Sequence, residues 1–269
     1  MRALEHATLR SGAPARPDHG QVTGRYGDAV TSGVMRDAGR PERTRVASVG
    51  RPPWWALVIA LLVAGLATAD LLAGGVLERL DLRVSETIGG WGLRDSPAYP
   101  VVWAVTQLGG RATISIVLAV LVGYLAWSRR TWLPLIRVLI ALATLTLAVY
   151  ALKHGTGRTA PGHPDELFFH IDGASFPSGH VANAVLMWGV ARWQAVEYGL
   201  PLQVQRAFWL LSVAGPAATG IAMVSLNFHW VTDAVVGAAV GVVLLGVVHA
   251  LDALVLSRWV RARAGRQSA

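Results

Sequence analysis

The amino-acid sequence predicts an all-α fold in which six membrane-spanning helices form a bundle. Two observations predict it. The 269-residue chain is 53% hydrophobic and only 15% charged, with a mean hydropathy of +0.45, whereas a soluble domain carries about 25% charged residues. In addition, a series of apolar runs follows residue 53, and most are about as long as a helix that crosses the bilayer core. Composition therefore excludes a water-soluble globule. The absence of cysteine excludes disulfides and thiolate-bound metal centres.

The chain divides into one membrane domain, residues 51–257, and two polar ends. Residues 1–50 are rich in Arg, Gly, Pro, Ser and Asp and have no apolar period. Such a segment cannot bury enough apolar surface to offset its loss of conformational entropy, so we predict a disordered basic tail. Residues 258–269 form a second basic tail. We expect both tails to lie in the cytoplasm.

Within the membrane domain, each apolar run is taken as one helix, since about 20 apolar residues cross the hydrocarbon core. We expect the second helix to extend backwards into residues 101–108 and the fourth to start near Ser178. Residues 81–88 are expected to lie along the membrane interface. The six predicted spans are residues 54–76, 112–127, 132–152, 181–193, 207–225 and 234–256.

The arginines predict the orientation of these spans. The informative ones are Arg43, Arg45 and Arg51 before the first span, Arg129 and Arg130 between the second and third, Arg192 and Arg206 around the gap between the fourth and fifth, and Arg258, Arg261, Arg263 and Arg266 after the sixth. With an even number of spans, all of these places fall on one side, which the positive-inside rule identifies as the cytoplasm. We therefore predict a multi-pass protein of the plasma (inner) membrane with both termini cytoplasmic. The net charge of +8 is interpreted as membrane-flanking charge and not as a nucleic-acid surface. The sequence does not predict an oligomeric state.

The fourth span starts at the sequence Pro177-Ser178-Gly179-His180, in a loop expected on the extracytoplasmic side. Ser178 is a good N-cap, and Gly179 lets a ligand approach the backbone closely. The free N–H groups and the positive dipole end of a helix then form an anion site. His180 is placed beside that site, able to donate a proton. The alternative is a simple helix cap with an interfacial histidine.

The sixth span starts with a second histidine, also predicted to be extracytoplasmic. His229 and Asp233 are four residues apart, so on a helix they share one face. An aspartate that accepts a hydrogen bond from Nδ1 leaves Nε2 as a nucleophile or base; an interfacial cap pair is the alternative. Lys153, the single lysine of the chain, ends the third span, where it is either a site residue or a membrane anchor. Arg158, in a glycine-rich turn, is positioned to clamp a phosphate.

Two histidines, an aspartate, a lysine and an anion-binding helix end suit phosphoryl transfer through a phosphohistidine. We expect no cofactor and no metal. Asp165, Glu166 and Asp172 lie nearby, but their spacing matches no metal motif. Zinc on His163 and His170 is a weaker alternative.

These residues resemble the motifs of the type-2 phosphatidic acid phosphatase superfamily, and the resemblance covers about residues 54–256. The family motifs are Lys-x6-Arg-Pro, Pro-Ser-Gly-His and Ser-Arg-x5-His-x3-Asp. Lys153 and Pro161 match the first motif, residues 177–180 match the second, and His229 and Asp233 match the third.

The resemblance implies a metal-independent phosphatase embedded in the bilayer. It implies that His229 attacks phosphorus, that Asp233 orients His229 and that His180 protonates the leaving oxygen. Lys153 and the Ser178–Gly179 backbone would hold the phosphate oxygens.

The sequence departs from the family pattern at both phosphate-binding arginines. Ala160 occupies the first position and Met223 the second. We expect Arg158 to replace the first arginine. Nothing obvious replaces the second, although Asn227 has a side chain that can donate a hydrogen bond. Loss of one charge-assisted contact to the transition state costs about 3 kcal/mol, so phosphate handling is expected to differ from the family pattern.

The predicted activity is hydrolysis of a lipid phosphate or diphosphate, with undecaprenyl diphosphate, phosphatidic acid and phosphatidylglycerol phosphate as the candidates that the family implies. Two alternatives stay open. The phosphoryl group could pass to an acceptor other than water. Alternatively, the chain could be a catalytically weak lipid-binding or transport relative, because both motif arginines are replaced.

Overall fold

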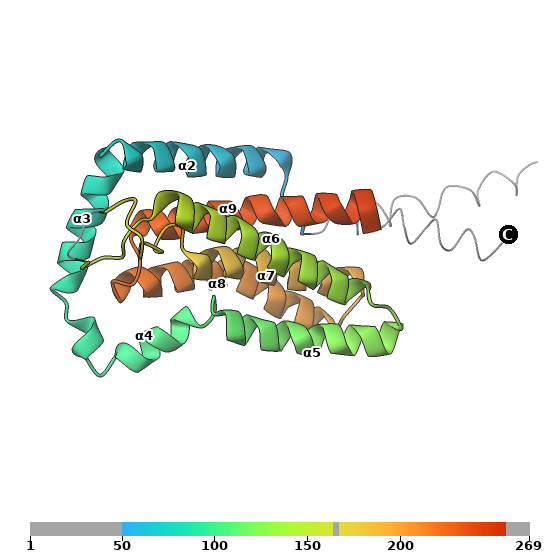
Figure 1. Ribbon diagram of the computed structural model, residues 1–269. Coiled ribbons are helices and arrows are strands. Elements are labelled where there is room, and N and C mark those ends of the chain that lie inside the picture. Colours follow the sequence, from blue (N-terminus) through green and yellow to red (C-terminus); the bar gives the residue numbers. More distant parts are fainter. Residues whose placement is uncertain (1–49, 164–166, 257–269) are drawn as a thin grey trace, which may run out of the picture. The chain divides into compact units, whose positions relative to one another are not determined.

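The computed structural model describes residues 50–163 and 167–256, and every regular element in these ranges is helical (Figure 1). The all-α prediction is confirmed. The predicted tails lie outside the described residues, apart from residue 50. The elements are α2 (Trp54–Leu72), α3 (Val76–Gly89), the short 3-10 helix η1 (Leu93–Asp95), α4 (Tyr99–Thr106), α5 (Arg111–Arg129), α6 (Leu133–Thr156), α7 (Gly179–Glu197), α8 (Leu202–Ser225), α9 (Val231–Leu251) and the π-helical turn η2 (Asp252–Leu256).

Five helices in the described part of the chain are long and apolar enough to cross a membrane: α2, α5, α6, α8 and the α9 segment up to Leu254. They correspond to five of the six predicted spans. The remaining predicted span is α7, a 19-residue helix that does not meet this criterion. The number of six spans therefore stays a prediction.

Helix α7 is the centre of the bundle, with α5, α6, α8 and α9 packed around it. Its Ala182, Leu186, Met187 and Val190 side chains are fully buried in the main apolar cluster. A helix surrounded by protein does not need the apolar surface that a lipid-facing helix needs. This explains why α7 can contain polar side chains and have a lower mean hydropathy than the lipid-facing helices.

The second predicted span does not extend into residues 101–108. Those residues form a separate short helix, α4, and the chain bends at Gly109 and Gly110 before α5 begins. The bend requires a residue without a side chain, because a Cβ atom on Gly109 would lie 2.5 Å from the carbonyl oxygen of His180. Hydropathy alone does not report this close approach.

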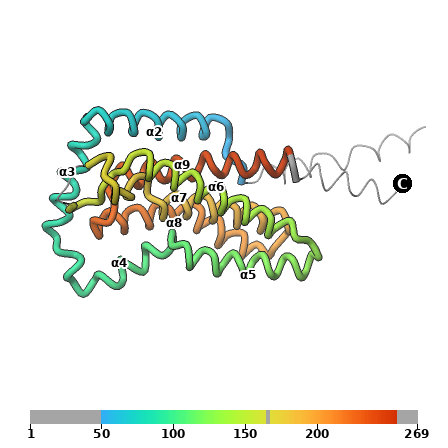
Figure 2. The backbone as a smooth tube through the Cα atoms, viewed as in Figure 1, coloured from blue at the N-terminus to red at the C-terminus, as the bar shows by residue number. Residues whose placement is uncertain are grey.

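The elements that carry the polar loops lie at one end of the bundle. Figure 2 shows α3, α4 and the loop between α6 and α7 at that end, and the turn between α5 and α6 at the other. The residues expected along the interface belong to α3, which runs across the ends of the long helices (Figure 1). Its Asp81 side chain is buried, so α3 contributes to the interior of this end.

Candidate active site

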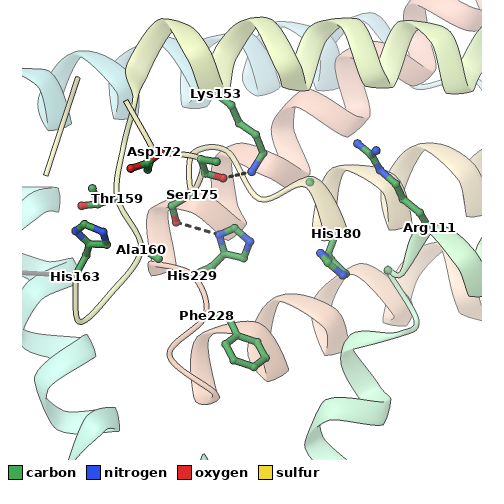
Figure 3. Close-up of a pocket in the computed structure, with 13 residues that line it drawn as sticks. Arg111, Lys153, Thr159, Ala160, His163, Asp172, Ser175, His180, Phe228 and His229 are labelled. Atoms are coloured by element: carbon green, nitrogen blue, oxygen red, sulfur yellow. Dashed lines mark hydrogen bonds between the residues drawn. The ribbon is translucent and has the colours of Figure 1, made fainter. Parts of the chain in front are cut away.

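A cavity of ≈ 580 Å³ opens at the loop end of the bundle, and both predicted histidines line it (Figure 3). Its walls come from the start of α5, the end of α6, the loop that follows α6, the start of α7, and the segment before α9. Segments far apart in the chain therefore meet at one site. The polar side chains around it include Arg111, Lys153, Asp172, Ser175, His180 and His229.

His229 is oriented by the first turn of α9. Its Nδ1 atom lies 3.1 Å from Oδ2 of Asp233 and 3.2 Å from Oγ of Ser175. Asp233 is fully buried, and its Oδ2 also accepts hydrogen bonds from the Ser175 hydroxyl and from the Trp230 backbone N–H. With a proton on Nδ1 donated to these oxygens, the lone pair of His229 is on Nε2. The pair thus has the arrangement that nucleophilic catalysis needs.

Arg158 lies behind this pair and not in the cavity, which corrects its predicted role as a phosphate ligand. Its guanidinium donates to Asp233 at 2.7 Å, to Asp81 at 2.8 Å and to Thr232 at 2.8 Å. The side chain is 1% exposed and is absent from the cavity lining. Two carboxylates compete with any phosphate for this cation, so Arg158 supports Asp233 and does not replace the motif arginine.

Ser178 also differs from the expectation. It occupies the N-cap position of α7, but its backbone N–H donates to the Asp233 carbonyl oxygen at 2.9 Å. Its side chain is buried, and Oγ has no hydrogen-bond partner among the described residues. Gly179 and His180 do line the cavity, and the first N–H groups of a helix have no intrahelical acceptor. The structure therefore places the backbone of Gly179, and not that of Ser178, at the cavity.

Lys153 lies where the sequence predicts, in the last turn of α6, and it lines the cavity. Its ammonium group donates a hydrogen bond to the carbonyl oxygen of Ala174, which directs it toward the loop before α7 (Figure 3). The positive charge of Lys153 is thus held at the cavity wall, on the side where His229 and His180 lie.

The two positions of the missing motif arginines differ in their surroundings. Ala160 lines the cavity, so an arginine there would reach it. Met223 is buried within α8. Asn227 is not a cavity residue: its side-chain oxygen accepts from Ser85 at 2.8 Å, and its carbonyl oxygen accepts from Arg94 at 2.6 Å. It therefore does not take the place of the second arginine.

The residues considered as metal ligands form no cluster in the described ranges, where no group of three or more His, Asp or Glu side chains is placed to hold an ion. His163 and His170 pack edge to face, with ring centroids 5.2 Å apart. Asp172 lines the cavity. Asp165 and Glu166 lie outside the described residues.

Three contributors to the site were missed by the sequence reasoning: Asp81, Arg111 and Ser175. Asp81 is 77 residues from Arg158, and Ser175 is 58 residues from Asp233, so no spacing pattern joins them. Arg111 follows a Gly-Gly pair at the start of an apolar run, which is also typical of a residue that flanks a membrane span. None of the three carries a local signal of its role.

Comparisons with known proteins agree with this architecture. The model of the PAP2 superfamily matches residues 134–254. Phosphatidylglycerophosphatase B of Bacillus subtilis (strain 168) is 29% identical over 154 residues, which cover 56% of this chain and 74% of the relative.

The fold is similar to a solved structure, that of the first transmembrane PAP2 type phosphatidylglycerolphosphate phosphatase from Bacillus subtilis. The TM-score is 0.54 at 21% identity, and the match covers 76% of this chain and 96% of that chain.

Proposed function

We propose that this multi-pass membrane protein, which the PAP2 superfamily model matches over residues 134–254, is a member of that superfamily and hydrolyses a lipid phosphate or diphosphate through a phosphohistidine. The observation that carries the proposal is that His229 and His180, 49 positions apart in the sequence, line one cavity together with Lys153. The Bacillus relative is named for phosphatidylglycerol phosphate. That lipid, phosphatidic acid and undecaprenyl diphosphate are the candidate substrates.

The proposed reaction has two steps. Nε2 of His229 attacks phosphorus, an N–P bond forms, and the P–O bond to the lipid breaks as the protonated, imidazolium form of His180 gives a proton to the leaving oxygen. Water then attacks the phosphohistidine, giving its proton to His180, and inorganic phosphate leaves as the N–P bond breaks. Asp233 keeps the Nδ1 proton of His229 in place and stabilises the positive charge that develops on the ring.

The cavity offers positive groups where the negative charge of the transferred phosphoryl group develops. Lys153 is on its wall, and the N-terminus of α7 presents the backbone at Gly179 and His180. Donors placed in advance around a transition state are the largest contribution to many enzymatic rates. The imidazole nucleophile requires no metal-activated water, so the proposed reaction is independent of metal and of cofactors.

We further propose that the cavity faces the extracytoplasmic side of the plasma membrane and that both termini are cytoplasmic. This is supported by Arg129 and Arg130, which end α5 at the end of the bundle opposite the cavity (Figure 1). Arginines next to spans are retained on the cytoplasmic side. The cavity would then receive a lipid head group from the outer leaflet. Residues 1–50 and 258–269 would be the cytoplasmic tails of the membrane domain at 51–257.

The proposal is tested with purified protein in detergent, by measuring phosphate release from phosphatidylglycerol phosphate and phosphatidic acid in the presence of EDTA. We expect activity that survives EDTA. In His229→Ala we expect kcat to fall by a factor of about 10⁴ or more, because removal of the catalytic nucleophile has effects of at least this size in other enzymes. His154→Ala is the matched control, because His154 is exposed on α6 and does not line the cavity.

The possible outcomes separate the alternatives. No turnover of either lipid, with wild type and His229→Ala indistinguishable, would identify a lipid-binding or transport relative. Transfer of the group to an added polyol in place of phosphate release, detected by mass spectrometry, would identify a phosphotransferase. Activity abolished by EDTA would overturn the metal-free mechanism.

A further inference from the structure

Arg111 provides the only guanidinium that lines the cavity within the described ranges. It is the first residue of α5, in a part of the chain that contributes to none of the family motifs. We propose that Arg111 binds a phosphate carried by the leaving group, so that the enzyme prefers lipid diphosphates and other lipid phosphates with an anionic leaving group. This inference rests on the proposed function and adds a substrate class to it.

The joint between α4 and α5 fixes the position of Arg111. The carbonyl oxygen of Gly109 accepts a hydrogen bond from Asn183 at 2.9 Å, and that of Leu108 accepts one from Trp188 at 2.8 Å. Both donors belong to α7, the helix that begins beside His180. Backbone-to-backbone approach at Gly109 is so close that a Cβ atom would clash with His180. The start of α5 is therefore held against the same helix that presents the proposed acid.

Arg111 lies on the side of His180 and not of His229. Figure 3 shows the His180 side chain between the His229 side chain and the backbone of Arg111. Arg111 interacts electrostatically with His180 and with Lys153. In an in-line displacement the leaving oxygen is opposite the nucleophile. The position of Arg111 is thus next to the leaving group.

The guanidinium of Arg111 has no partner among the described residues, since none of their hydrogen bonds or ion pairs involves it. Arg158, in contrast, donates to two carboxylates and to Thr232 and does not line the cavity. A guanidinium binds phosphate oxygens in a planar, bidentate geometry. An arginine exposed at the cavity wall is available for this contact, and an arginine enclosed by aspartates is not.

The positions of the two cations favour a second phosphate on the substrate. The charged side chains of the cavity wall, apart from the histidines, are Arg111, Lys153 and Asp172. The Lys153 ammonium group is held by the carbonyl oxygen of Ala174 on the side of His229, where the transferred phosphoryl group would lie (Figure 3). Arg111 then remains for a further anion, which diphosphates and phosphatidylglycerol phosphate carry on their leaving groups. Phosphatidic acid, whose leaving group is an uncharged diacylglycerol, does not carry one.

The test compares farnesyl diphosphate with farnesyl monophosphate, two substrates with the same chain that differ in the leaving-group phosphate. We expect Arg111→Gln to lower kcat/KM for the diphosphate by at least about tenfold, the size of one charge-assisted hydrogen bond. The loss for the monophosphate is expected to be several times smaller. Arg111→Lys should restore part of the preference. Arg129→Gln is the matched control, at the opposite end of the same helix, and should change neither value.

Each result decides the inference. Equal losses with both substrates would show that Arg111 binds the transferred phosphoryl group, and would overturn the preference for an anionic leaving group. No loss with either substrate would overturn the contact itself. If the wild type hydrolyses neither substrate nor the lipids tested above, the proposed function fails, and the inference fails with it.

Discussion

Each end of the bundle contains a buried arginine bonded to two carboxylates, but only one end has a catalytic geometry. At the loop end, Arg158 joins Asp81 and Asp233. At the other end, Arg137 joins Asp252 through two hydrogen bonds of 2.8 and 3.0 Å and contacts Glu197 at 2.9 Å.

Their surroundings differ. The guanidinium of Arg137 lies over the ring of Trp193, which in turn stacks on His249 at 3.9 Å. Asp233 instead faces His229 at the wall of the cavity. A buried ionic cluster by itself ties helices together; it serves catalysis only where one of its carboxylates also orients a group that reaches substrate.

Among variants that test the two clusters, the largest effect is expected for Arg158→Met, which leaves Asp81 and Asp233 buried without the guanidinium. Removing one partner of a buried ion pair costs about 3–5 kcal/mol, and the loss of order at Asp233 also releases His229. We expect a lower midpoint of thermal unfolding in detergent and a fall in kcat of at least about a hundredfold in the protein that remains folded. Retention of both stability and activity would show that the cluster is not required.

Arg137→Met tests the same kind of cluster away from the cavity. Asp252 and Glu197 lose the guanidinium of Arg137, but the Glu197 side chain is 28% exposed and can be solvated, so the cost is expected to be about 2–3 kcal/mol. Thermal unfolding should shift downwards while kcat/KM of the folded fraction stays at the wild-type value. A large loss of kcat here would contradict the distinction between the two ends.

Asp81→Asn removes one charge from the loop-end cluster and leaves Asp233 paired with Arg158. The amide oxygen can still accept from Thr232, whose backbone N–H lies 3.1 Å from Oδ1 of Asp81. We expect a loss of about 1–3 kcal/mol and a moderate fall in kcat. These are measured by thermal unfolding and by phosphate release, with Asp95→Asn in η1 as the control. An effect as large as that of Arg158→Met would mean that Asp81 is the dominant partner.

The smallest effect is expected for Asn183→Leu, which leaves the Gly109 carbonyl oxygen without its donor. A lost side-chain hydrogen bond in the interior costs about 1–3 kcal/mol. Because this bond holds the α4–α5 joint, the variant should lower the ratio of kcat/KM for farnesyl diphosphate to that for the monophosphate. Reduced stability with an unchanged ratio would show that Asn183 does not position Arg111.

The parts of this fold that were predictable are those coded by continuous stretches of sequence. Apolar runs located α2, α6 and α9 to within a few residues at most ends, because a lipid-facing helix must be apolar along its length. The motif residues located His180 and His229 at helix starts for a similar reason, since caps and glycines act locally.

The parts that were not predictable depend on contacts between distant segments. The break between α4 and α5 is required by the approach of Gly109 to His180, and nothing near residue 109 reports it. Arg158 resembled a phosphate ligand because its partner Asp81 is located on α3. Arg111 resembled a flanking charge because only the packing of α5 against α7 brings it to the cavity.

The position of Asp81 has a consequence for dissecting this protein. The segment that matches the family model, residues 134–254, includes Arg158 and Asp233 but not Asp81 on α3 or Arg111 on α5. Expressed alone, that fragment would retain His229, the proposed nucleophile, and lack one of the two carboxylates that bind Arg158. Co-expression of residues 1–96 and 97–269 as two polypeptides should restore what the isolated fragment lacks, and so show that a working catalyst needs segments outside the family-matched region.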